Sequence, residues 1–123
     1  PAQNSTVDML LSAAAKARQK GAAAEELELL DRALATAPED ARTHNARGMR
    51  ALADRDFDRA QQCFAAAARL DPRAPALWLN LASAQRALGD EAGERDSLDR
   101  ALDLDRLNFV AVLRSAELYE RVG

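Results

Sequence analysis

The residues that could support catalysis in this sequence are one histidine, His44, one cysteine, Cys63, and a cluster of glutamates. A histidine and a cysteine could form a nucleophilic dyad, but the sequence positions no third group to orient the histidine. The same two residues cannot complete a zinc site without carboxylates at matching spacing. Glu25, Glu26 and Glu28 crowd one stretch, where carboxylates at a helix start favour the helix dipole. We therefore predict that this segment is not an enzyme and has no catalytic residue, cofactor or metal site.

The composition indicates which elements position these side chains. Hydrophobic residues make up 48% of the 123 residues, which argues against disorder and suits one small domain. Isoleucine is absent and other β-branched residues are few, whereas alanine, leucine, arginine and glutamate are abundant. These four are strong helix formers, so the predicted fold class is all-α.

The charge and the apolar runs limit the partners. A net charge of -3 does not favour non-specific binding to nucleic acid. No apolar run approaches the roughly 20 residues that a membrane-spanning helix needs. Residues 41–74 carry seven basic and four acidic groups, whereas the stretches on either side are acidic, which favours an acidic partner. One cysteine allows no internal disulfide and suits a reducing compartment, so we expect a cytoplasmic location.

An internal repeat organises the chain. The five residues Leu-Asp-Arg-Ala-Leu at 30–34 recur at 98–102, an offset of 68 residues, which is twice 34. Pro38 and Pro72 lie 34 residues apart. A period of this length predicts helix pairs that stack against their neighbours, because no single pair can bury its apolar face alone.

The 34-residue repeat resembles the tetratricopeptide repeat (TPR) family. On this resemblance one TPR domain spans 1–123, with repeats at about 7–40, 41–74 and 75–108 and a half repeat at 109–123. The twenty-seventh position, alanine in the family pattern, is Ala33, Ala67 and Ala101. Glu26, Glu94 and Gln85 depart from the pattern at packing positions. The resemblance implies a right-handed superhelical solenoid of antiparallel helix pairs.

Seven helices are predicted. The first helices of the repeats span about 6–20, 40–53, 75–88 and 108–122, and the second helices span about 23–36, 57–70 and 91–104. Gly21 and Gly89 suit the turns after first helices, where a left-handed backbone is easy for glycine. Asp56 is predicted to cap the second helix of the middle repeat.

The resemblance also places a binding groove. In the family the concave face comes mainly from the first helices, and the corresponding positions hold side chains suited to a peptide. Asparagine can donate to and accept from a peptide backbone, arginine can pair with a carboxylate, and methionine gives adaptable apolar contact. The predicted peptide-binding residues are Arg42, Asn45, Met49, Asn80, Ser83, Arg86 and Arg114.

One partner class can be compared residue by residue. Family members that hold the C-terminal carboxylate of heat-shock chaperones use lysines, asparagines and an arginine at fixed positions. Asn80 and Arg114 match two of these positions, but Asn45, Met49 and Val110 occupy the others. The sequence therefore disfavours this partner class.

The last half repeat leaves the function open between two classes. Its helix carries Phe109, Val112 and Tyr119, which are family packing residues. We expect the apolar face of this helix to contact another element or another copy of the chain, and we expect the chain to be a fragment. The first class is a module that binds a protein or peptide in its groove. The alternative is a non-catalytic arm of a larger bacterial enzyme, of the aspartyl/asparaginyl hydroxylase or the glycosyl- or sulfotransferase kind.

Overall fold

The computed structural model describes the backbone of residues 2–122 and the side chains of residues 5–122. Within these residues the chain forms seven α-helices and no strand, which confirms the predicted all-α class. The helices are α1 (Ala2–Gln19), α2 (Ala23–Thr36), α3 (Ala41–Ala53), α4 (Phe57–Leu70), α5 (Pro75–Leu88), α6 (Glu91–Leu104) and α7 (Phe109–Val122). The predicted bounds hold closely for the second helices, whereas α1 begins a turn earlier than predicted.

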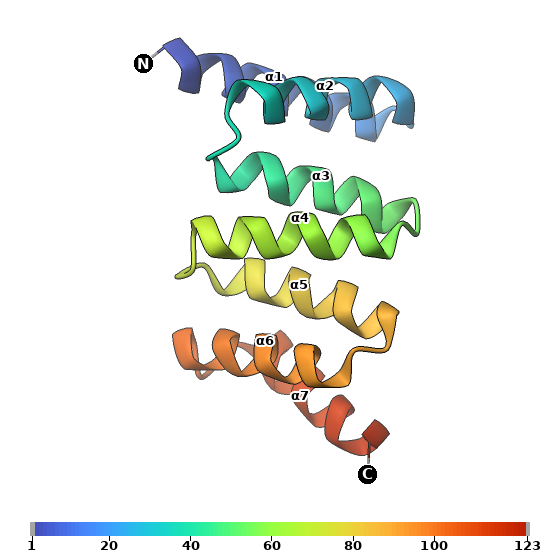
Figure 1. Cartoon of the computed structure of the whole chain (residues 1–123), viewed down its shortest axis with the longest axis vertical. Coiled ribbons are helices and arrows are strands. Elements are labelled where there is room, and N and C mark those ends of the chain that lie inside the picture. The colour runs from blue at the N-terminus through green and yellow to red at the C-terminus, as the bar shows by residue number, and fades with distance from the viewer. Residues whose placement is uncertain (1, 123) are drawn as a thin grey trace.

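The helices form an elongated stack rather than a closed bundle (Figure 1). Each helix packs mainly against its neighbours in sequence, and the N- and C-termini lie at opposite ends of the stack. α1, α3, α5 and α7 are the first helices of successive repeats, and α2, α4 and α6 are the second helices. This order places residues about 34 positions apart on adjacent helices.

Short turns end the first helices. Gly21 and Gly89 have φ values of 74° and 77°, as predicted for these two positions. In the middle repeat Arg55 takes the equivalent conformation with φ of 61°. The Asp56 carboxylate then accepts a hydrogen bond from the Arg59 amide at 3.3 Å, so the predicted cap of α4 is present.

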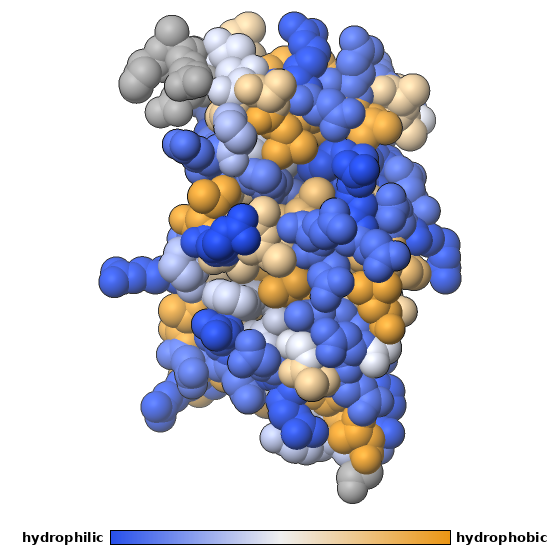
Figure 2. Space-filling model, viewed as in Figure 1, coloured by the Kyte–Doolittle hydropathy of each residue, from blue (hydrophilic) through white to orange (hydrophobic). Residues whose placement is uncertain are grey.

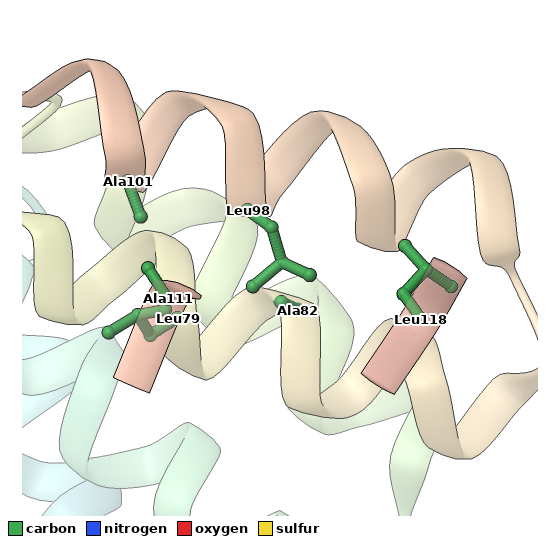
Figure 3. Packing of buried hydrophobic residues seen from close by; sticks show 6 residues of the cluster. All are labelled: Leu79, Ala82, Leu98, Ala101, Ala111 and Leu118. Atoms are coloured by element: carbon green, nitrogen blue, oxygen red, sulfur yellow. The ribbon is translucent and has the colours of Figure 1, made fainter. Parts of the chain in front are cut away.

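The core is built from small side chains at the helix crossings. One cluster joins α5, α6 and α7 through Leu79, Ala82, Leu98, Ala101, Ala111 and Leu118, which meet between the helices in Figure 3. A second cluster surrounds Phe64 of α4, whose side chain is fully buried. Alanine at these crossings lets the helices approach closely, so each buried large residue fills a tight space.

Polar groups replace apolar ones at three core positions. Glu26 of α2 is 3% exposed, and its Oε1 lies 2.9 Å from Nη1 of Arg50 in α3. Glu94 of α6 is buried in the same way and pairs with Arg121 of α7. Gln85 is buried on α5 and accepts a hydrogen bond from a buried serine hydroxyl on α6 at 2.7 Å. These three departures from the family pattern are therefore satisfied by partners on neighbouring helices. Two further departures, Arg47 and Arg106, differ from them: Arg47 Nε is buried without a hydrogen bond, 3.3 Å from Asp31, and Arg106 is exposed.

The visible surface is mainly hydrophilic, with separate apolar patches between charged side chains (Figure 2). Among the described helices none is both long and apolar enough to cross a membrane.

Candidate functional site

A row of side-chain bridges joins the first helices along one face of the stack. Asp8 of α1 forms an ion pair with Arg42 of α3. Asn45 of α3 is hydrogen-bonded to Asn80 of α5, and Ser83 of α5 is hydrogen-bonded to Arg114 of α7. The partners are separated by 31 to 35 residues, close to one repeat. Six of the seven predicted binding residues take part in this row of contacts.

The end of this face nearest the N-terminus contains a pocket. The pocket has a volume of about 280 Å³ and lies between α1, α2 and α3. It is lined by Leu11, Ala14, Ala15, Arg18, Glu26, Leu30, Arg42, Asn45, Ala46 and Met49. Three of the predicted binding residues, Arg42, Asn45 and Met49, therefore share one concave site, which we name the α1–α3 pocket.

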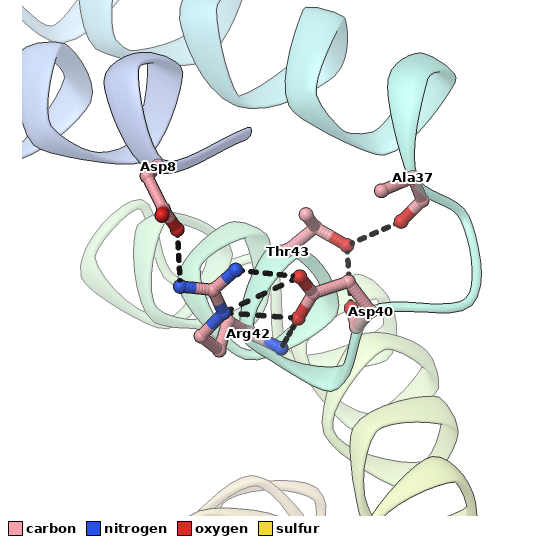
Figure 4. A network of polar contacts seen from close by, with 5 residues as sticks. All are labelled: Asp8, Ala37, Asp40, Arg42 and Thr43. Atoms are coloured by element: carbon pink, nitrogen blue, oxygen red, sulfur yellow. Dashed lines mark hydrogen bonds and ion pairs between the residues drawn. The ribbon is translucent and has the colours of Figure 1, made fainter. Parts of the chain in front are cut away.

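Arg42 forms one wall of the pocket and is held by two carboxylates (Figure 4). Its Nη1 donates to Asp8 at 2.7 Å and its Nη2 donates to Asp40 at 2.8 Å. The hydrogen bond from the Arg42 side chain lowers the pKa of the Asp40 carboxyl below its ordinary value, and both acids raise the pKa of Arg42. The Asp40 carboxylate also accepts from the Arg42 amide at the start of α3, so the same acid caps the helix. Arg42 is therefore already paired with two carboxylates, which an acidic group of a ligand would have to displace.

Asn45 and Asn80 bind each other across the face. Asn80 Nδ2 donates to Asn45 Oδ1 at 2.8 Å, and both residues are half-buried. Each amide keeps its second polar atom out of this bond, so a peptide backbone could still reach an Asn45 donor and an Asn80 acceptor.

The three remaining predicted residues lie toward the C-terminal end of the face. Arg114 Nη1 donates to Ser83 Oγ at 2.6 Å and to the Leu79 carbonyl at 3.0 Å. Arg86 lies 3.4 Å from a carboxylate oxygen of Glu117, and both side chains are about half exposed. The structure thus brings Arg86, Ser83 and Arg114 onto α5 and α7 but places none of them in the α1–α3 pocket.

Arg18 also lines the pocket, although it is not among the predicted binding residues. Its side chain is exposed, and it makes no ion pair with any residue between 5 and 122. The sequence could have indicated Arg18, because it occupies one of the repeat positions that form the inner face in the family. Among the described cations of the pocket it is the one that lacks a carboxylate partner.

His44 and Cys63 lie outside this site, whereas Glu26 lines the pocket and is paired with Arg50. His44 Nε2 lies 2.7 Å from the Pro38 carbonyl, so the ring joins two repeats. Cys63 is half-buried on α4, and burial raises the pKa of its thiol. No set of three or more His, Cys, Asp or Glu side chains in the described part of the chain could hold a metal ion.

Stacked antiparallel helix pairs with a concave row of polar side chains define an α-helical solenoid, a class that presents an extended surface. A sequence model of the tetratricopeptide repeat family matches residues 45–108, about half of the chain. The chain belongs to the tetratricopeptide repeat family.

Solved structures agree on the fold. The first TPR domain of Spaghetti (RPAP3) bound to the HSP90 peptide SRMEEVD aligns over 96% of each chain, with a TM-score of 0.88 and 16% identity. The Arabidopsis OM64 TPR domain aligns over 97% of this chain and 98% of its own, with a TM-score of 0.87 and 16% identity. A mutant of Thermobaculum terrenum O-GlcNAc transferase aligns over 88% of this chain and 21% of its own, with a TM-score of 0.78 and 24% identity. No curated protein matches the sequence.

Proposed function

We propose that the chain is a protein-interaction module that binds an extended segment of a partner protein along its concave face. The observation that carries this proposal is the α1–α3 pocket, where apolar side chains lie beside Arg18, which forms no ion pair within residues 5–122. Family membership supports it, and so does the similar domain whose structure holds a bound peptide. Next to the pocket, the side-chain amides of Asn45 and Asn80 can form hydrogen bonds with a peptide backbone.

We further propose that the bound segment carries an acidic side chain. Arg18 is the pocket cation with no carboxylate partner among the described residues, whereas Glu26 is already paired with Arg50. An arginine in a partly apolar pocket gains most from an ionised acceptor. Met49 and Leu11 suit an apolar side chain next to that acid.

Replacing Arg18 by glutamate is expected to weaken binding of acidic peptides by roughly tenfold to hundredfold, because one charge-assisted hydrogen bond is lost. The measurement is fluorescence anisotropy with labelled peptides that differ only in having Asp, Asn or Lys at one position. Arg18→Lys should keep part of the affinity. Arg32→Glu makes the same charge change outside the pocket and serves as the control. Equal affinity for the Asp and Lys peptides would reject the acidic preference, and equal binding by Arg18→Glu and the parent chain would reject this pocket.

We also propose that the exposed face of α7 mediates self-association. Phe109, Val112, Ala116 and Tyr119 follow the three- and four-residue spacing of a coiled-coil seam. Phe109 is 75% exposed and Tyr119 is 60% exposed, unusually high for aromatic residues arranged on one helix face. An antiparallel second copy would set Phe109 against Tyr119 and Val112 against Ala116, so the seam is self-complementary.

Replacing Phe109 by serine is expected to weaken self-association by roughly tenfold or more, because a large apolar side chain is no longer buried. Sedimentation velocity over a concentration series measures this. Leu107→Ser is the matched control, since Leu107 is exposed but precedes α7. A parent chain that stays monomeric at every concentration would contradict the proposal.

A second candidate function is a non-catalytic arm of a larger enzyme. The alignment that covers 21% of the O-GlcNAc transferase supports this candidate. A catalytic domain encoded in frame after Gly123 would establish it, and a stop codon at that point would reject it.

A further inference from the structure

A second groove lies between α4 and α6, with α5 as its floor. Its main pocket has a volume of about 370 Å³ and is lined by Ala65, Ala68, Arg69, Pro72, Trp78, Leu81, Asp96 and Arg100. A smaller pocket of about 210 Å³ adjoins it, shares Pro72, Trp78 and Arg100, and adds Asp103 and Leu104 to the lining. We name the two pockets together the Trp78 groove.

The Trp78 groove is separate from the concave site. Trp78 and Asn80 lie two residues apart on α5, so their side chains point about 200° apart around the helix. Asn80 bonds to α3 on the inner face, whereas Trp78 packs against residues of α4 and α6. A ligand in one site therefore leaves the other site open.

The floor of the groove is apolar. The indole Nε1 of Trp78 donates to the Pro72 carbonyl at 2.9 Å, so the one polar atom of the ring is already satisfied. What the side chain offers to a ligand is the face of its ring. Leu81 is buried beside it and Ala65 is half-buried, so an apolar side chain would meet apolar surface on several sides.

The rim of the groove carries a cation that lacks a partner. Arg69 is exposed and makes no ion pair with any residue from 5 to 122. The repeat explains this, because Ala65 stands four residues before Arg69 at the position that Asp31 and Asp99 occupy in the flanking repeats. An aspartate at this position would be spaced to pair with Arg69 along α4. The middle repeat therefore lacks the acid, and the flanking repeats hold Ala35 and Asp103 where it has Arg69.

The second arginine of the groove can move. The Arg100 guanidinium lies 4.9 Å above the Trp78 ring and its Nε lies 3.2 Å from Asp96. Both charged side chains are more than half exposed, and exposed pairs of this kind contribute little to stability. Arg100 can therefore turn from the ring toward an incoming anion at small cost.

We propose that the Trp78 groove binds a partner peptide in which an aliphatic side chain is flanked by carboxylates. The aliphatic group lies on the Trp78 ring and Ala65, and the carboxylates pair with Arg69 and Arg100. This site acts independently of the concave pocket and gives the module a second docking surface on another side of the solenoid.

Trp78 is the only tryptophan in the sequence, so its fluorescence reports on this site directly. The probes are acetylated and amidated Glu-Leu-Leu-Glu, Gln-Leu-Leu-Gln and Lys-Leu-Leu-Lys peptides. The glutamate peptide should shift the Trp78 emission in a saturable way, and the lysine peptide should bind at least about tenfold more weakly.

Two variants test the assignment, one at half-buried Ala65, which packs against the Phe64 cluster, and one at exposed Arg69. Ala65→Asp restores the residue of the flanking repeats and supplies Arg69 with an internal carboxylate, and Arg69→Glu reverses the exposed charge. Each should raise the glutamate-peptide concentration at the midpoint of the Trp78 emission shift at least about tenfold. Arg18→Glu changes the α1–α3 pocket only, so it should leave that emission titration unchanged even though it weakens binding of acidic peptides in the α1–α3 pocket. Unaltered binding by both folded variants, or equal binding of the glutamate and lysine peptides, would overturn the proposal. Loss of binding in Arg18→Glu alone would instead assign the peptide to the concave pocket and also overturn it.

Discussion

Replacing Arg50 by leucine is expected to lower the free energy of unfolding by about 3–5 kcal/mol, because Glu26 would keep its buried position without its cation. The Glu26 side chain is 4% exposed and that of Arg50 is 14% exposed, so water screens this pair little. Arg50 also bonds Asp54, and these two acids raise the pKa of its guanidinium, Asp54 more than Glu26. Urea unfolding followed by circular dichroism measures the effect.

The double variant separates the buried charge from lost packing. Glu26→Leu with Arg50→Leu should recover most of the loss, because two apolar side chains of similar volume leave no buried charge behind. Arg100→Leu is the surface control and should change stability by at most about 1 kcal/mol, since the Arg100–Asp96 pair is exposed. If Arg50→Leu lowers the free energy of unfolding no more than Arg100→Leu does, the buried Glu26–Arg50 pair does not stabilise the fold as predicted.

The sequence predicted the order and bounds of the helices because repeat spacing and turn residues are local signals. Pro38 and Pro72 fixed the period, and Gly21 and Gly89 marked the turns that the structure shows. The spacing could not reveal why Glu26 is tolerated at a packing position. Its partner Arg50 lies 24 residues away in another repeat, and only the stacking of α2 on α3 brings them together.

The sequence predicted which residues share the binding face, but not which of their side chains are free to bind a ligand. The resemblance placed Arg42, Asn45 and Asn80 on the inner surface, and the structure shows them in contacts between neighbouring first helices. Their hydrogen bonds depend on side-chain geometry across neighbouring helices, which spacing does not determine. Arg42 is consequently occupied by Asp8 and Asp40, and Arg18 becomes the stronger candidate for contact with a ligand. Whether these residues bind a peptide stays a prediction.

The second large effect on stability is expected from changes to the close packing around Phe64. Phe64 is fully buried on α4, so Phe64→Ala is expected to lower the free energy of unfolding by about 3–5 kcal/mol through lost burial and the cavity left behind. Gly48 of α3 lies against the ring, and a Cβ at position 48 would come within 2.7 Å of Phe64 Cε1 and 3.1 Å of Cys63 Cβ. Gly48→Ala should therefore destabilise the chain by about 1–2 kcal/mol, even though alanine is the better helix former.

The sign of the Gly48→Ala effect should reverse once the ring is gone. In the Phe64→Ala background the new methyl group meets no ring carbon, so it fills part of the cavity and adds the helix preference of alanine, about 1 kcal/mol. The double variant should then be more stable than Phe64→Ala alone, which gives a clear coupling between the two sites. Thermal and urea unfolding of the four chains measures this coupling. Equal effects of Gly48→Ala in both backgrounds would show that the close approach of α3 to α4 is not set by the Phe64 ring, and that the missing side chain at position 48 serves another contact.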